Sequence, residues 1–287
     1  MNEQGQHRIP EVYLKQFGFQ DKGGKWWIST WRKGDEFTNN KSIKSFTKEI
    51  DIFDLPFTNI NYKRLFENYT STIETSYPKI IDEINTKNKL SEVSFSILVQ
   101  LMFSIFARTN IFLEMIDKIL RSEKREYFLS EVTFYFEKEE GESIIRNLKK
   151  IDVDFQLNTI MFPVCLYFIR KITSSNFDYV ILRDYQNRGW FTSDSPVILF
   201  NNINNETLLS KETEIYFPLS KDYCLYIDHK DYNRSNSLRG KDGEELADAS
   251  EEFHEKITKY IVRSTFQYLI HPTDLGRIKL SPANQEK

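Results

Sequence analysis

Cysteine and histidine are scarce in this chain, whose 287 residues contain 2 Cys and 4 His. The two cysteines, Cys165 and Cys224, lie in the apolar stretches "MFPVCLYFI" and "YCLYID". We therefore expect both to be small buried residues in a reducing compartment, rather than a disulfide or a catalytic nucleophile. No Cys/His spacing typical of a metal site occurs, which argues against a zinc-binding module.

Long apolar segments and phosphate-binding loops are also missing. The most apolar stretch, residues 93–107, contains Gln100 and is shorter than the ~20 residues that cross a bilayer. The N-terminus has no apolar signal region, so we expect a soluble, cytoplasmic protein with no membrane partner. Neither a P-loop nor a dinucleotide-binding fingerprint is present.

The chain has no excess of basic charge. Lys and Arg number 39 and Asp and Glu number 42, which gives a net charge of −3. This balance gives no support to tight nonspecific binding of a nucleic-acid duplex, which needs a basic stripe. It leaves room for a small basic pocket.

Apolar material is abundant, with 40% hydrophobic and 15% aromatic residues. This is enough for a core, and we expect residues 1–280 to form a single compact domain followed by a loose tail at 281–287. The patterns run strands, helices, strands, helix, which predicts an α+β fold rather than alternating βαβ units.

The first half of the chain divides into a small β element and a helical part. Residues 1–58 predict a helix at 10–18 and strands in "KWWISTWRK" and "SIKSFTKEIDIFDL". Residues 60–172 predict a central, buried helical bundle. Its members are a helix from about Tyr62, one long helix over Leu90–Leu120, and a buried helix kinked at Pro163.

The second half returns to strands. Residues 177–232 predict antiparallel hairpins, one turning at "QNRG" and one at "LSKD". Residues 243–270 predict one long closing helix with an apolar stripe.

His7 opens the stretch "HRIPEVYLKQF" and stands just before the predicted helix start at Pro10. An imidazole can give or take a proton near neutral pH, and the positive end of a helix favours its neutral form. His7 is therefore a candidate general base or acid. The alternative is a structural role, as a helix cap or a donor to a carbonyl oxygen.

Arg108 follows fifteen largely apolar residues, so its guanidinium needs a partner in the interior. One interpretation is a buried ion pair with Asp194 or with a glutamate of a helix. The other is a clamp for a phosphate or carboxylate of a substrate.

Asp194 lies in "TSDSPV" between two apolar runs. It is a candidate to orient His7 or to bind a divalent ion, and the alternative is a turn formed with the local backbone. Its neighbour Ser193 is a candidate substrate-binding residue. Neither Ser193 nor Ser195 lies in a Gly-x-Ser-x-Gly elbow, which argues against a serine nucleophile.

His254 and Thr258 share one face of the predicted last helix, and both are candidates for substrate binding or for contacts at the edge of the core. The tryptophans of the N-terminal strands are candidates to stack a base or dock a protein partner, with packing inside a small sheet as the alternative. They are Trp26, Trp27 and Trp31.

Several of these segments together resemble a bacterial family known as domain of unknown function 4238. The motifs are "HRIPEVYLKQF", "FARTNIF", "WFTSDSPVILF" and "IYFPLSKDYCLYI", in the family's order, and the helix with Glu67 and Glu74 also fits. The chain departs from the family pattern at Asn110, where proline is usual, and at Thr258, where asparagine is usual. The resemblance implies a fold and a set of residues, and no particular reaction.

A cleft that joins His7, Arg108, Asp194 and Thr258 or His254 would hold a base, an anion clamp and a carboxylate. That set suits hydrolysis of a phosphodiester or another anionic substrate. We therefore expect a nuclease-like hydrolase that binds nucleic acid or another phosphorylated ligand. A divalent metal is an optional cofactor, and a toxin or antiphage role is an optional biological function. The alternative hypothesis is a non-catalytic binding or sensor protein whose polar residues form a buried network.

Overall fold

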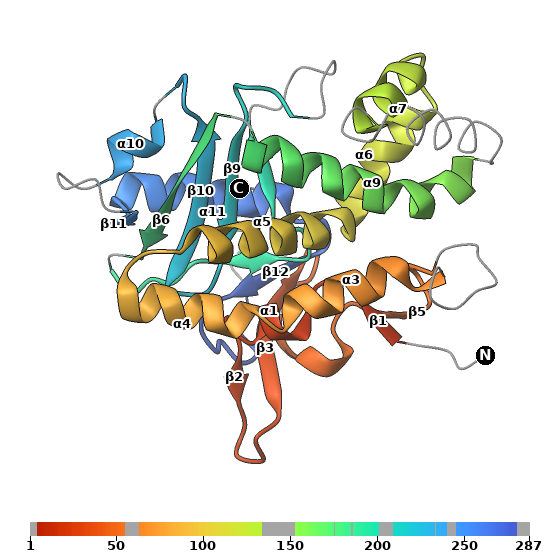
Figure 1. Cartoon of the computed structure of the whole chain (residues 1–287). Coiled ribbons are helices and arrows are strands. Elements are labelled where there is room, and N and C mark those ends of the chain that lie inside the picture. Colours follow the sequence, from red (N-terminus) through yellow and green to blue (C-terminus); the bar gives the residue numbers. More distant parts are fainter. Residues whose placement is uncertain are drawn as a thin grey trace.

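The computed structural model describes residues 5–54, 63–133, 153–174, 176–184, 186–200, 209–232, 234–239 and 245–279. The tail predicted at 281–287 lies outside this part of the chain. The architecture is α+β, as the sequence predicts, with a helical layer, a main sheet and a second, smaller sheet (Figure 1).

The N-terminal region contains short strands and one short helix. Strand β1 (Gly5–His7) pairs with β5 (Lys48–Ile50), and β3 (Trp26–Arg32) pairs with both β2 (Phe19–Gln20) and β4 (Thr38–Ser42). In the chain, α1 (Glu11–Leu14) lies between β1 and β2, and the 3-10 turn η1 (Ile43–Ser45) lies between β4 and β5. The helix predicted at 10–18 is thus much shorter, and Pro10 precedes it instead of occupying its first turn.

The helical region contains α3 (Leu65–Glu74), α4 (Tyr77–Lys87), α5 (Glu92–Ala107), α6 (Asn110–Leu120), α7 (Arg125–Thr133) and α9 (Val153–Ser174). The single helix predicted over Leu90–Leu120 is wrong, because the chain bends by 70° between α5 and α6. The side chain of Thr109 causes this break by accepting a hydrogen bond from the backbone N–H of Phe112, which starts a new helix. Within the described residues no single helix is long and apolar enough to cross a membrane. Of these helices, the bent pair of α5 and α6 reaches the required length and apolar composition when the two are taken together.

The main sheet has the strand order β11 (Leu246–Asp248), β6 (Phe177–Arg183), β10 (Tyr223–His229), β9 (Glu214–Pro218) and β8 (Ile198–Phe200). Successive side chains of a strand point to opposite faces, so each strand can feed two cores. Ile181 faces the core shared with the helical region, whereas Val180 and Leu182 face a second core that includes Ile257 and Ile261 of α11 (Glu251–Ser264). The sheet is therefore covered on both faces, and α10 (Arg234–Leu238) packs against β6 and β10.

Of the two predicted hairpins, one is confirmed and one is wrong. β9 and β10 pair across "LSKD", with Cys224 opposite Pro218. β6 does not pair with the run after "QNRG", because that run forms β7 (Thr192–Ser193) and joins the smaller sheet. The carboxylate of Asp184 accepts a hydrogen bond from the backbone N–H of Gly189, whose φ of +74° turns the chain away from the main sheet.

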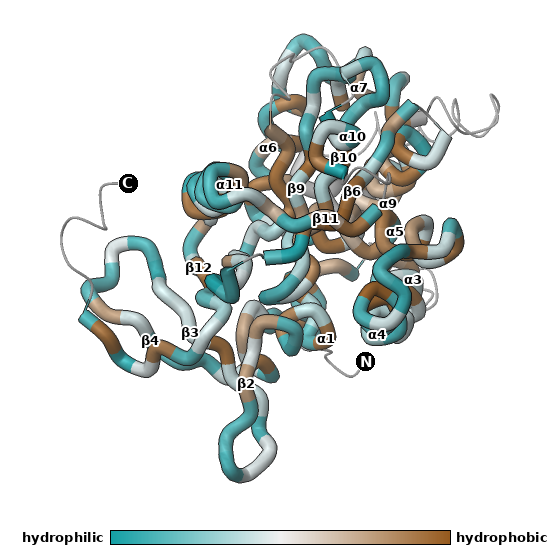
Figure 2. Tube along the Cα trace, turned by 90° about the vertical axis from the view of Figure 1, so that its left-hand side faces the viewer, coloured by the Kyte–Doolittle hydropathy of each residue, from teal (hydrophilic) through white to brown (hydrophobic). Residues whose placement is uncertain are grey.

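The closing helix predicted at 243–270 is also too long. The segment instead contains β11, then α11, then β12 (Tyr268–His271). Ser250 caps α11 by accepting a hydrogen bond from the backbone N–H of Phe253. β12 pairs with β3 on one side and β7 on the other. The end of the chain therefore completes the N-terminal sheet, which stands to one side of the body with the β2–β3 hairpin at its outer end (Figure 2).

Candidate functional site

Arg108 lies at the end of α5 with only 1% of its surface exposed. Its guanidinium donates to the carbonyl oxygen of Ser104 at 3.2 Å, to that of His7 at 3.1 Å and to the Glu74 carboxylate at 2.7 Å. Of the partners considered from the sequence, the ion pair is therefore with a helix glutamate and not with Asp194. The contact with His7 brings two of the predicted residues together.

His7 ends β1, and its ring contacts two groups. Nδ1 lies 3.2 Å from the carbonyl oxygen of Phe46, and a carbonyl only accepts, so Nδ1 carries the proton. In the neutral ring Nε2 is then the nitrogen that can take up a proton. It lies 3.4 Å from the Glu11 carboxylate, which stabilises the charged ring once a proton arrives.

Arg8 adds a second guanidinium. It donates to the backbone carbonyl oxygen of Arg108 at 3.1 Å and pairs with the half-exposed carboxylate of Glu49 at 2.5 Å. Arg8 directly follows β1, and its guanidinium reaches the end of α5, where Arg108 also contacts the backbone carbonyl oxygen of His7. Each of the two arginines is paired with a carboxylate, Arg8 with Glu49 and Arg108 with Glu74.

Glu67 lies on α3, two helical turns before Glu74 and on the same face. Burial raises the pKa of the Glu67 carboxyl, the charge of Arg108 opposes this rise, and the charges of Glu74 and Asp54 reinforce it. Its Oε2 is buried and has no hydrogen-bond partner among the residues that the structure describes. A carboxyl in this state is a functional-site candidate, because burial of a polar atom without a partner is costly.

We call His7, Arg8, Glu67, Glu74 and Arg108 the Arg108 cluster. Gln6 fixes its position, since the buried side-chain amide donates to Asp54 at 2.8 Å and accepts from the backbone N–H of Phe53 at 2.7 Å. Lys63, just before α3, pairs with the same carboxylate at 3.1 Å. The cluster thus joins β1, α3 and the end of α5 through the bonds of Arg108, and α3 lies beside α5 in Figure 1.

Asp194 has different surroundings. Its carboxylate accepts from the backbone N–H groups of Phe266 at 3.0 Å, Gln267 at 2.8 Å and Tyr268 at 2.9 Å. Burial raises its pKa, although these N–H groups act in the opposite direction. Asp194 therefore holds the connection from α11 to β12. Ser193 supports the same bend, because its hydroxyl accepts from the backbone N–H of Ser195 at 3.0 Å.

His254 and Thr258 belong to a third group, between α11 and the segment after β6. His254 Nε2 lies 3.2 Å from the carbonyl oxygen of Gly189 and 3.5 Å from the Asp184 carboxylate, and its ring centre is 4.4 Å from that of Trp190. The Thr258 hydroxyl and the Trp190 ring N–H are buried without a partner in the described part of the chain. The predicted residues thus make three sets of contacts instead of one.

The other candidates from the sequence have ordinary structural contacts. Trp26 packs against the main core, Trp27 donates to the Asp21 carboxylate at 2.8 Å, and Trp31 donates to the backbone carbonyl of Asp35 at 2.9 Å. Both cysteines are buried, and burial raises the pKa of the Cys165 thiol to about 12. A thiol in this state is a poor nucleophile.

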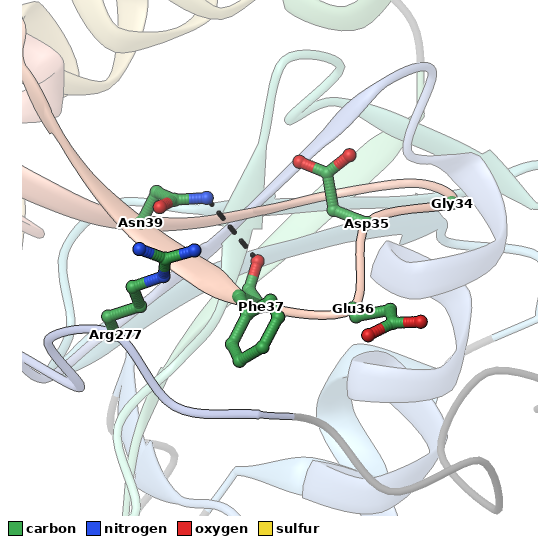
Figure 3. Close-up of a pocket in the computed structure, with 6 residues that line it drawn as sticks. All are labelled: Gly34, Asp35, Glu36, Phe37, Asn39 and Arg277. Carbon is green, nitrogen blue, oxygen red and sulfur yellow. Dashed lines mark hydrogen bonds between the residues drawn. The ribbon is translucent and has the colours of Figure 1, made fainter.

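No group of three or more His, Cys, Asp or Glu side chains is arranged to hold a metal ion within the described ranges. A hollow of about 360 Å³ lies beside the β3–β4 turn (Figure 3). It is lined by Gly34, Asp35, Glu36, Phe37, Asn39 and Arg277. The Arg277 guanidinium is 4.9 Å from the centre of the Phe37 ring. The carboxylates of Asp35 and Glu36 line the same hollow. This hollow contains none of the predicted site residues.

Sequence reasoning noted Glu67 and Glu74 only as part of the family pattern. The signal that places them in the site is their spacing of seven residues, which aligns both on the face of α3 that a buried arginine would need.

Comparison with other proteins gives one match. No curated protein and no solved structure matches the chain. The family described as "Protein of unknown function (DUF4238)" matches residues 5–274, which is nearly all of the chain. The chain therefore belongs to the family known as domain of unknown function 4238.

Proposed function

We propose that this protein is an intracellular, nuclease-like hydrolase that cleaves a phosphodiester or another anionic substrate at the Arg108 cluster. The observation that carries the proposal is Glu67, a half-buried carboxyl with a raised pKa whose Oε2 is buried without a described partner and which feels the charge of the buried Arg108. Such a carboxyl keeps its proton closer to neutral pH than an ordinary glutamate and can donate it during a reaction.

The reaction divides the proton transfers between two residues. His7 Nε2 removes a proton from water, whose oxygen forms a bond to phosphorus, and Glu67 donates its proton to the leaving oxygen as the old bond breaks. The positive charges of Arg108 and Arg8 stabilise the negative charge that develops on the phosphoryl oxygens. Glu74 holds Arg108 in place, so it is a positioning residue.

A second candidate function is favoured by the contacts of Arg108 itself. All three of its guanidinium nitrogens donate to groups of the protein. In a non-catalytic binding or sensor protein the same network would serve only to join β1 to α3 and α5.

The test is cleavage of labelled single-stranded and duplex oligonucleotides and of a chromogenic phosphodiester, with Mg²⁺ and with a chelator. We expect Glu67→Gln to lower kcat by about 100-fold or more, since acid–base catalysis contributes roughly 10²–10⁴ in rate. The exposed Glu114→Gln on α6 is the matched control and should behave as wild type. Absence of cleavage by the wild type, or equal rates for both variants, would favour the second function.

A toxin or antiphage role is part of the same proposal. Expression of the wild type should then slow cell growth or phage replication, and Glu67→Gln should abolish the effect at an equal protein level. Growth inhibition that persists in the variant would separate the biological role from the proposed chemistry.

A further inference from the structure

Tyr268 on β12 lies beside two cations that come from distant parts of the chain. Lys41 of β4 places its Nζ 4.7 Å from the centre of the Tyr268 ring, and the Arg32 guanidinium of β3 is 6.0 Å from it. Arg32 is directly opposite Tyr268 in the β3–β12 ladder. We call Tyr268, Lys41 and Arg32 the Tyr268 platform.

The charge of the platform is not compensated by a carboxylate. Neither Arg32 nor Lys41 forms an ion pair within the ranges that the structure describes. Arg32 instead pairs with the side-chain amide of Gln267. In the amide orientation that satisfies both its oxygen and its nitrogen, the oxygen accepts from the Arg32 guanidinium at 2.8 Å. Asp194 lies behind the platform, but backbone N–H groups already bind its carboxylate. Two cations with no anionic partner beside an aromatic ring favour an anionic ligand.

The charge of the surrounding region supports the same conclusion. Residues 5–50 contain nine Lys or Arg and five Asp or Glu, although the whole chain has a net charge of −3. The basic excess is therefore concentrated in the N-terminal region, which supplies two of the three platform residues. Phe266, two residues before Tyr268 in the chain, has an exposed aromatic side chain.

The platform is also connected to His7. The Phe46 ring packs edge-on against Tyr268 at 5.4 Å between centres, and the carbonyl oxygen of Phe46 contacts the His7 ring. One residue thus separates the platform from the proposed base.

We propose that the Tyr268 platform binds single-stranded nucleic acid, with phosphates on Lys41 and Arg32 and a base on the Tyr268 ring. Lysine and arginine beside aromatic rings are the usual means of holding single strands, because every base has a face that can stack. A duplex would require a wider basic surface than two cations provide. This inference rests on the proposed function, for which it names the substrate class.

The test is binding of a fluorescein-labelled single-stranded oligonucleotide of about a dozen nucleotides, followed by fluorescence anisotropy at several salt concentrations. We expect Arg32→Gln/Lys41→Gln to weaken binding at least tenfold and to reduce the log–log salt slope by about 1.4. Tyr268→Leu should weaken binding by about 5- to 100-fold with the slope unchanged. The exposed Lys79→Gln on α4 is the matched charge control.

Three results would overturn the inference. They are no binding of single strands by the wild type, an equal loss in the Lys79→Gln control, and displacement by poly-glutamate as effective as by unlabelled oligonucleotide. Cleavage assays separate the two proposals. Binding that depends on the platform, without cleavage of any substrate, would refute the proposed function alone, whereas cleavage with an unchanged KM in Arg32→Gln/Lys41→Gln would refute the platform alone.

Discussion

Two half-buried acidic sites of this protein, around Glu67 and around Asp194, differ in what surrounds the carboxyl group. Asp194 is held by three backbone N–H groups, whereas Glu67 lies among charged side chains and keeps one oxygen without a described partner. Backbone donors fix a carboxylate as part of a turn. Burial raises the pKa of both carboxyl groups, and at Glu67 the charges of Arg108, Glu74 and Asp54 act on it as well, so the Arg108 cluster is the better place for chemistry.

The largest effect that separates the two sites should come from Arg108→Met. It leaves Glu74 without its cation and the carbonyl oxygens of Ser104 and His7 without the guanidinium donor, and we expect a loss of about 3–5 kcal/mol in the free energy of unfolding. Urea titration of the purified variant measures it. The double variant Arg108→Met/Glu74→Gln should recover part of the loss, and equal losses in both would show that the ion pair contributes nothing.

A smaller loss should follow from Asp194→Ala, which removes the acceptor of three backbone N–H groups. We expect about 2 kcal/mol, because hydrogen bonds to charged groups each contribute roughly 1.5–3 and water replaces some of them at the surface. Asp194→Asn keeps one carbonyl oxygen and should lose less. Hydrogen exchange at Gln267 and Tyr268 should accelerate in the alanine variant, and unchanged exchange would contradict the structural role.

His254→Gln should have a smaller effect still. The contact of His254 with the Gly189 carbonyl is retained in part by the glutamine amide, while the packing on Trp190 is lost. We expect about 1 kcal/mol in stability, with oligonucleotide cleavage unaffected. A loss of cleavage with intact stability would instead assign the catalytic site to the region of His254 on α11.

The smallest expected effect is a difference between wild type and Glu67→Gln in how the free energy of unfolding depends on pH. Because burial raises the pKa of Glu67 in the folded state, the folded state binds more protons than the unfolded state in that range. The wild type should therefore lose stability relative to the variant as pH rises from the ordinary glutamate range through the raised pKa. Chemical denaturation at a series of pH values measures this difference. A constant difference would mean that Glu67 titrates normally.

The sequence predicted the strands and helices better than their connections. β3 and the β9–β10 hairpin follow from alternation and turn residues. The break at Thr109 was missed because apolar periodicity continues across it, and a single capping hydroxyl decides it. The partner of β7 was predicted wrongly and β12 was missed, because both strands are very short and their partners lie far away in the chain.

Of the Arg108 cluster, the sequence predicted His7 and Arg108 as site residues and did not single out Arg8. Glu67 and Glu74 were noted only within the family pattern. Arg108 needed a buried partner because of the apolar helix before it, and the structure identifies that partner as Glu74. Asp194 and His254 do not join His7, because tertiary contacts that no local pattern encodes place each of them in a separate group. The backbone that Asp194 binds lies more than seventy residues further along the chain.

The most direct measurement is a cleavage assay with Glu67→Gln and Asp194→Asn side by side, with thermal unfolding of each. Our account predicts that Glu67→Gln loses about 100-fold or more in kcat while it stays folded. Asp194→Asn should be less stable, yet keep its activity per folded molecule. The reverse result, a stable but inactive Asp194→Asn and an active Glu67→Gln, would contradict the assignment of chemistry to the Arg108 cluster.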